Sequence, residues 1–289
     1  MKVLVLGGLG MLGHRLYLTL KESHETRFTF RKAKTALELN FIKNEEGNFY
    51  ENIDLSSMQN LEKVITDFNP DMVINCVGII QKSVINSTPE IAYGINSVLP
   101  HKIAALGLKH NFKLIHISTD CVFSGKEGNY TEESPINPSG TYGITKQLGE
   151  VDYLENTLTI RTSIIGRELG NSKSLVEWFI NETEVGGYEN VFYSGLPTYT
   201  LSKLINEEIL NRPELSGIIN IGSHPVSKLD LLKFINDEFN LSKKVNRTKG
   251  PDLNMHLNCS SFEKITKKET PKWEELTQDL LIADPLYDK

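Results

Sequence analysis

The sequence has few cysteines, no long apolar run and no excess of basic residues. Only Cys76, Cys121 and Cys259 occur in 289 residues, and this odd, sparse count favours reduced thiols in the cytoplasm over a disulfide framework. The formal net charge of -6 argues against a basic face that binds nucleic acid or an anionic membrane. No apolar run is long enough to span a bilayer. We therefore expect a cytoplasmic protein with no nucleic-acid or membrane partner.

The histidines also lack a metal-binding pattern. None of the seven forms the short ligand spacings that hold zinc and similar ions, so we expect no metal in the catalytic site. Apolar residues make up 39% and charged residues 24%, which is typical of a globular protein. The length allows one large domain, or one domain with an appended lobe.

Short apolar runs alternate with helical stretches in the first half of the chain. The alternation predicts parallel strands joined by crossover helices, a Rossmann-type doubly wound α/β fold. The expected strands are 2–7, 24–30, 71–78, 112–118 and 158–163. The expected helices are 10–22, 57–68, 89–109 and one that carries the segment TYGITK. In the second half we expect helices near 201–210 and 229–239, and an irregular, polar last forty residues.

Three glycines mark the first strand-to-helix turn. Gly7, Gly10 and Gly13 have the spacing G-x-x-G-x-x-G, directly after a strand and at the start of a helix. Glycines let the backbone approach a pyrophosphate, which binds the N–H groups at the start of the helix, here Met11 and Leu12. The alternative is a plain strand-to-helix turn. We assign residues 1–161 to an NAD(P)-binding Rossmann domain and 162–289 mainly to a smaller C-terminal substrate-binding lobe, while a strand near 217–222 could return to the first domain.

The end of the second strand bears on the choice of cofactor. An acidic residue there would bind the ribose 2′-hydroxyl of NAD, but this chain has Arg31 and Lys32. A basic pair suits the 2′-phosphate of NADP, so NADPH is favoured and NADH remains possible. Two exposed bases at a strand end are also a common solvated feature.

Two further loops are candidates for the cofactor site. Asp54, followed by Leu55, could accept a hydrogen bond from the adenine amino group, or could cap the helix at Ser56. The segment 75–78 ends a strand, and its backbone at Cys76, Val77 and Gly78 could pass beside the cofactor riboses. Asn75 and Gly78 could equally be turn residues.

Polar residues that follow the strand at 112–118 are candidates for catalysis. Ser118, Thr119 and Asp120 come at its carboxyl end, where open α/β sheets bind ligands. Tyr142 and Lys146 lie four residues apart in a helical stretch and therefore share a face. They could be a surface pair, or a proton donor and the ammonium that lowers its pKa.

These segments together resemble the extended short-chain dehydrogenase/reductases, and within them the dTDP-4-dehydrorhamnose reductase group. The resemblance rests on STDCVFSG at 118–125, Glu132, Pro138, TYGITKQLGE at 141–150 and RTS at 161–163. It covers most of the chain and is strongest over residues 1 to about 165.

The resemblance implies a set of roles for these residues. Tyr142 would protonate the alkoxide formed when hydride reaches a ketone, with its pKa lowered by Lys146. Lys146 would also hold the nicotinamide ribose, and Ser118 would belong to the cofactor site. Thr119 would hydrogen-bond the same carbonyl oxygen. Sugar-nucleotide dehydratases carry Glu where this chain has Cys121, so dehydration is not expected.

The second half supplies weaker candidates for the substrate site. SGLPT at 194–198 resembles the family's Gly-x-Pro-Thr turn beside the substrate. Pro197 is therefore a candidate for substrate binding, together with Asp120 and Val122. Trp178 could line the sugar-nucleotide pocket or belong to the core. The segment 256–262 keeps the Leu-Asn of a family motif that reaches the nucleotide, but His256 takes the place of its arginine.

The resemblance implies an NADPH-dependent reductase of the C4 ketone of a nucleotide-activated 4-keto-6-deoxyhexose in surface polysaccharide synthesis. The sugar could be dTDP-4-keto-rhamnose or a UDP-2-acetamido-4-keto-2,6-dideoxyhexose. A sugar-nucleotide 4-epimerase and a non-catalytic nucleotide-binding regulatory subunit are the alternatives. The expected partner is a nucleotide sugar, and a homodimer is possible.

Overall fold

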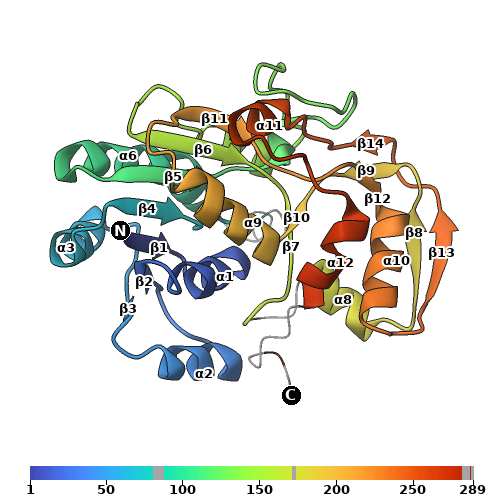
Figure 1. Cartoon of the computed structure of the whole chain (residues 1–289), viewed down its shortest axis with the longest axis horizontal. Helices are drawn as coiled ribbons and strands as arrows, with labels where there is room; N and C mark the ends of the chain where they lie inside the picture. The colour runs from blue at the N-terminus through green and yellow to red at the C-terminus, as the bar shows by residue number, and fades with distance from the viewer. Residues whose placement is uncertain (81–87, 171–173, 282–286, 288–289) are drawn as a thin grey trace.

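The computed structural model describes residues 1–80, 88–170, 174–281 and 287, and its centre is a seven-stranded sheet (Figure 1). The strand order is β11-β6-β5-β4-β1-β2-β3, and every neighbouring pair is parallel. The strands are β1 (Lys2–Leu6), β2 (Glu25–Thr29), β3 (Phe49–Tyr50), β4 (Met72–Asn75), β5 (Lys113–Ile117), β6 (Thr157–Arg161) and β11 (Gly217–Asn220). This confirms the Rossmann-type α/β prediction. The order reverses between β1 and β4, and such switch points form ligand sites.

Helices cover both faces of the sheet and bury one apolar side each. In α3 the residues Leu61, Val64, Ile65 and Phe68 are buried, with the spacing of a single helical face. The helices are α1 (Met11–Leu20), α2 (Ala36–Asn44), α3 (Met58–Phe68), α5 (Pro89–Tyr93), α6 (Leu99–His110), α7 (Thr141–Gln147) and α9 (Thr198–Leu204). The core under α3 and α6 is separate from the larger core under α1 and α9.

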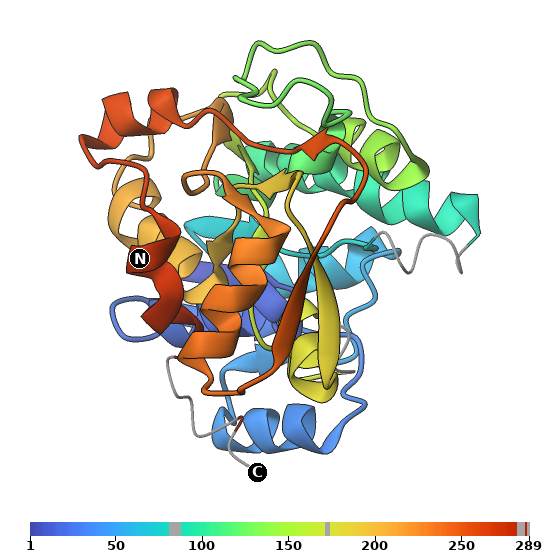
Figure 2. The ribbon, with the colours of Figure 1, turned by 90° about the vertical axis from the view of Figure 1, so that its right-hand side faces the viewer.

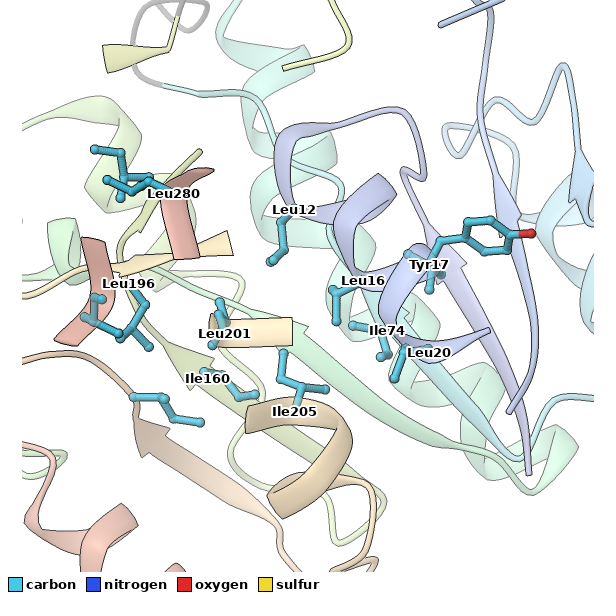
Figure 3. Close-up of a cluster of buried hydrophobic side chains, with 14 of the residues drawn as sticks. Leu12, Leu16, Tyr17, Leu20, Ile74, Ile160, Leu196, Leu201, Ile205 and Leu280 are labelled. Carbon is cyan, nitrogen blue, oxygen red and sulfur yellow. The ribbon is translucent and has the colours of Figure 1, made fainter. Parts of the chain in front are cut away.

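The larger core joins the two halves of the chain. Leu12 and Leu16 of α1 face Leu201 of α9 and the adjoining Ile205, as Figure 3 shows, and all four side chains are buried. The helix α9 therefore packs against the first crossover helix of the sheet. Because this apolar surface is continuous, folding of the two halves should be coupled.

The C-terminal half adds small sheets beside the main one (Figures 1 and 2). The strand β13 pairs in parallel with β8, and α10 lies against both. The elements are β7 (Ile164–Ile165), α8 (Leu175–Asn181), β8 (Glu184–Tyr188), β9 (Val191–Tyr193), β10 (Leu196–Pro197), β12 (Val226–Ser227), α10 (Lys228–Glu238), β13 (Lys244–Thr248), β14 (Leu253–Asn254), α11 (Ser260–Thr266) and α12 (Trp273–Leu281). Within the described ranges, no helix is long and apolar enough to cross a membrane.

Two sequence-based expectations, on the last forty residues and on the helix over 89–109, need correction. The described part of the last forty residues is not wholly irregular, because it contains α11 and α12, and α12 buries Trp273, Leu276 and Leu280. The helix expected over 89–109 is interrupted by a π-helical turn at Gly94–Val98. The apolar run at 217–222 contains β11, which hydrogen-bonds to β6 in the main sheet. The role of 162–289 as a substrate lobe stays a prediction.

Leu201→Ala should lower the free energy of unfolding by about 2–5 kcal/mol, because it opens a cavity in the shared core. Leu39→Ala on α2 is the control; Leu39 is 59% exposed, and a change within about 0.5 kcal/mol is expected. Urea denaturation followed by circular dichroism measures both. Equal losses in the two variants would contradict the shared core.

Candidate functional site

A cavity of about 1020 Å³ lies at the carboxyl ends of β1, β2 and β4. This is the switch point of the sheet, and the volume is at the upper end for small-molecule and cofactor sites. Nine of the predicted cofactor residues line it: Gly7, Gly10, Arg31, Lys32, Asp54, Leu55, Cys76, Val77 and Gly78.

The glycine turn forms one wall of the cavity and can accept no side chain at its tightest point. Gly7 has φ +83°, and a Cβ on Gly13 would lie 2.1 Å from the Gly7 carbonyl oxygen. Met11 and Leu12 do not line the cavity, and the Leu12 side chain belongs to the core. As the first residues of α1, their N–H groups have no acceptor within the helix and can bind a phosphate. The turn therefore fits a dinucleotide.

Four basic side chains also line the cavity. The expected Arg31 and Lys32 are exposed, and Lys34 and Lys102 also line the wall. Glu38 lies there too, but its carboxylate accepts from the Lys34 and Thr35 N–H groups at 2.5 and 2.8 Å. Sequence reasoning missed Lys34 although it follows the basic pair closely. Lys102 on α6 could not be placed without the fold.

Asp54 makes a local turn at the cavity wall. Its Oδ1 accepts from the Ser56 N–H at 2.9 Å, and the helix α3 is preceded by Ser57 rather than Ser56. Hydrogen bonds from Ser56 and the charge of Arg31 hold the Asp54 pKa below its usual range. Asp54 is thus a turn residue at the cavity wall, and its contact with adenine stays a prediction.

Cys76 follows β4, and its thiol is not reactive. Burial raises the pKa of Cys76 to about 12, so the thiol stays protonated at neutral pH. The preceding Asn75 accepts from the Val77 N–H at 3.1 Å, which shapes the turn at the strand end. Asn75 and Cys76 therefore have a structural role in the cavity wall.

Asn96 is a buried residue that the sequence did not reveal, and it joins the cavity wall to α7. Its Oδ1 accepts from the Ile79 N–H at 2.8 Å, and its Nδ2 donates to the Ile79 carbonyl and to Thr145 Oγ1, both at 3.0 Å. Asn96 lies in the π-helical turn, a feature common at functional sites. It fixes the helix that carries Tyr142 and Lys146.

Lys146 is buried at the end of β5 and is 4% exposed. Its Nζ donates to the Ile117 carbonyl at 2.7 Å and lies 3.4 Å from His116 Nε2. Burial lowers the pKa of Lys146 to about 8, against the opposing charge of Glu150. The ammonium therefore contacts Ile117, which precedes Thr119 by two residues, at the strand end where the catalytic site was predicted.

Tyr142 has a pKa shift in the direction opposite to the one expected. Burial raises its pKa, the neighbouring Cys121 adds to this, and a hydrogen bond with Thr119 acts against it. Lys146 is not among the causes, because its ammonium is directed at the Ile117 carbonyl. The expectation that Lys146 lowers this pKa is wrong for the protein alone. A raised pKa keeps the phenol protonated, as a proton donor requires.

Thr119 connects Tyr142 to Asp120. Its hydroxyl donates to Asp120 Oδ1 at 3.0 Å and accepts from the Cys121 N–H at 3.2 Å. Asp120 is buried, and desolvation raises its pKa. Three of the residues predicted for catalysis and substrate binding, Thr119, Asp120 and Tyr142, therefore lie together.

A buried ion pair between Arg161 and Glu150 lies next to the strand end that carries Thr119 and Asp120. Arg161 donates to both carboxylate oxygens of Glu150, at 2.9 and 2.7 Å, and Ser118 Oγ donates to the same carboxylate at 2.7 Å. Ser118 is not among the residues that line the cavity. Its hydroxyl holds the strand end next to Thr119.

Comparison with known proteins identifies the family. The family model of the RmlD substrate binding domain matches residues 1–283. The chain belongs to the RmlD substrate binding domain family. This confirms the resemblance drawn from the sequence, and the match includes both halves of the chain.

Two curated relatives and one solved structure illustrate the likeness. Methionine adenosyltransferase 2 subunit beta of Rattus norvegicus is 25% identical over 287 residues, which cover 91% of this chain and 82% of the relative. The dTDP-4-dehydrorhamnose reductase of Aggregatibacter actinomycetemcomitans is 26% identical over 200 residues, covering 65% of this chain and 68% of the relative. A hypothetical dTDP-4-dehydrorhamnose reductase from Sulfolobus tokodaii has a TM-score of 0.78 at 26% identity, covering 94% of this chain and 97% of that one.

The remaining residues predicted for the substrate site of this RmlD-family chain differ in burial. Trp178 on α8 is 38% exposed, so it does not belong to the core. Val122 is buried in a small apolar cluster with Phe123 and Tyr130, and Pro197 is buried where β10 meets α9. Their contact with substrate stays a prediction. Among the described residues, no group of three or more His, Cys, Asp or Glu side chains could hold a metal ion.

An NMR titration of lysines labelled at ¹³Cε should contain one resonance with a midpoint at about pH 8, from Lys146. The reason is that burial disfavours the charged ammonium. The spectrum of Lys146→Met identifies the resonance by its loss. A midpoint at the ordinary lysine value, about 10.4, would contradict the buried geometry.

Proposed function

We propose that this protein is an NADPH-dependent reductase of the C4 ketone of a nucleotide-activated 4-keto-6-deoxyhexose. The observation that carries the proposal is the convergence of Thr119, Tyr142 and Lys146 at the carboxyl end of β5. The likeness to the Aggregatibacter dTDP-4-dehydrorhamnose reductase and to the hypothetical Sulfolobus reductase supports it. The product would enter surface polysaccharide synthesis.

The cavity supports NADPH as the cofactor. The glycine turn and the first N–H groups of α1 would hold the pyrophosphate, while Arg31 and Lys32 would bind the 2′-phosphate. The bound cofactor supplies a hydride to the ketone carbon. The chain itself binds and orients the reactants and supplies the proton.

The proton comes from Tyr142 in this proposal. Its raised pKa keeps the phenol protonated until negative charge forms on the sugar oxygen. Thr119 hydrogen-bonds the same oxygen and orients it. Lys146, on the same helix one turn after Tyr142, would hold the cofactor ribose.

Two other reactions of similar enzymes are less well supported. Dehydration needs a base where Cys121 lies, but burial and the charge of Asp120 raise the Cys121 pKa, so the thiol stays protonated. A 4-epimerase keeps one NAD bound through both half-reactions, whereas the basic residues favour an exchangeable NADP.

The second candidate is a subunit of a larger enzyme. The observation in its favour is the length of the match to methionine adenosyltransferase 2 subunit beta, 91% of this chain against 65% for the dTDP-4-dehydrorhamnose reductase. The presence of Thr119, Tyr142 and Lys146 argues for catalysis, because a binding subunit does not need a proton donor.

The deciding experiment is NADPH oxidation, followed by absorbance, with two 4-keto substrates made in situ. These are dTDP-4-keto-rhamnose and the UDP-linked 4-keto-2-acetamido-2,6-dideoxyhexose. Turnover of either supports the reductase and names its sugar class. No turnover with NADPH bound, together with co-purification of a stoichiometric partner, supports the subunit.

Tyr142→Phe should lower kcat by about 10²- to 10⁴-fold, because it removes the proton donor. NADPH affinity should change little, since the ring remains. The control is Tyr188→Phe on β8, which changes an exposed tyrosine outside the site. Near-normal turnover of Tyr142→Phe would contradict the role of Tyr142 as proton donor.

Arg31→Ala should weaken NADPH binding by about 10-fold or more and leave NADH binding nearly unchanged. The lost interaction is a charge-assisted hydrogen bond to the 2′-phosphate, which NADH lacks. Arg247→Ala on β13, an exposed arginine paired with Glu189, serves as the control. Titrations followed by nucleotide fluorescence give the affinities, and equal weakening of both would mean that Arg31 does not contact the 2′-phosphate.

A further inference from the structure

Lys228 is a half-buried lysine that the fold brings to the catalytic site from the C-terminal half. It is the first residue of α10, directly after β12, and β12 pairs with β9 in the register Val226 to Tyr193. Its Nζ lies 3.8 Å from the centroid of the Tyr193 ring. An ammonium over an aromatic face at this distance is a favourable cation–π contact.

The ring under Lys228 is held in one position. Tyr193 is buried, and a Cβ on Gly195 would lie 2.0 Å from its Oη and 2.1 Å from its Cζ. Only glycine at 195 therefore leaves room for the ring. The Trp273 ring, 6.3 Å away between centroids, packs on it as well. The position of the Lys228 ammonium thus depends on a rigid platform.

The carboxylate whose charge acts on Lys228 belongs to Asp120. Burial raises the Asp120 pKa, and the charge of Lys228 acts against that rise. Burial lowers the Lys228 pKa, and the charge of Asp120 acts against that fall. A cation from one half of the chain therefore acts on the charge of an anion from the other half, and Thr119 donates to Asp120 Oδ1 at 3.0 Å.

The ammonium retains hydrogen-bonding capacity. In the part of the chain that the structure describes, Lys228 Nζ contacts the Tyr193 ring and donates no hydrogen bond to a protein oxygen. An ammonium has three N–H donors, and hydrogen bonds to acceptors stabilise a partly buried ammonium. A bound ligand can supply them.

We propose that Lys228 and Asp120 together bind hydroxyl groups of the hexose, with the Lys228 ammonium donating to one oxygen and the Asp120 carboxylate accepting from a hydroxyl. This assignment rests on the proposed function. A hydroxyl is both donor and acceptor, so it suits an opposite-charge pair. The diphosphate suits this place less, because the Asp120 carboxylate repels a second anion.

The test measures binding by calorimetry in the presence of NADP. The ligands are two matched pairs, dTDP-glucose with dTDP, and UDP-N-acetylglucosamine with UDP. One of the two pairs contains the nucleotide sugar that wild type binds. Lys228→Met should weaken binding of that nucleotide sugar by about 10- to 100-fold and leave the affinity for its nucleoside diphosphate unchanged. Lys228→Arg, which keeps the cation, should recover part of this loss. The control is Lys233→Met, an exposed lysine on the same helix.

The outcomes separate this inference from the proposed function. If wild type binds neither nucleotide sugar, the proposed function fails, and this inference fails with it. If wild type binds one and Lys228→Met binds it equally well, only the role of Lys228 is overturned. Equal weakening of the nucleotide sugar and its nucleoside diphosphate would place Lys228 on the diphosphate and overturn the hydroxyl assignment. NADP affinity reports folding, and if Lys228→Met loses it, the same two affinities are compared for Lys228→Gln.

Discussion

The site depends on how the protein accommodates the buried ammonium of Lys146. Desolvation of such a charge costs several kcal/mol per ion, so it needs compensating partners. The Ile117 carbonyl accepts one hydrogen bond from Lys146, and the negative charge of Glu150 favours the ammonium. Glu150 is itself held by Arg161.

A second set of contacts fixes the helix that carries Tyr142. Asn96 in the π-helical turn donates to Thr145 Oγ1, and Ser97 Oγ donates to the Thr145 carbonyl at 2.8 Å. These bonds hold α7 against the helix α5–α6. Because Tyr142 and Lys146 lie on α7, both side chains keep their places relative to Thr119. The strand end, the interrupted helix and the buried ion pair therefore act as one support.

The sequence predicted the central sheet and the glycine turn because their signals are local. The strand KVLVL of β1 is almost wholly buried, which gives a continuous apolar run, and the tight turn at Gly7 and Gly13 admits no side chain. The pKa direction of Tyr142 and the cavity position of Lys102 could not be predicted, since both depend on contacts between distant segments. Lys228 was missed for the same reason: its neighbour Asp120 lies in the other half of the chain.

The central claim is that Tyr142, Thr119 and Lys146 serve a hydride transfer to a sugar ketone. The most direct measurement is isotope transfer from NADPH that carries deuterium in the transferable position at C4 of the nicotinamide. Each of the two 4-keto nucleotide sugars is incubated with it, and the product is analysed by mass spectrometry and NMR. One deuterium at C4 of the sugar is the expected result. A protein that binds NADPH but transfers no deuterium to either sugar would contradict it.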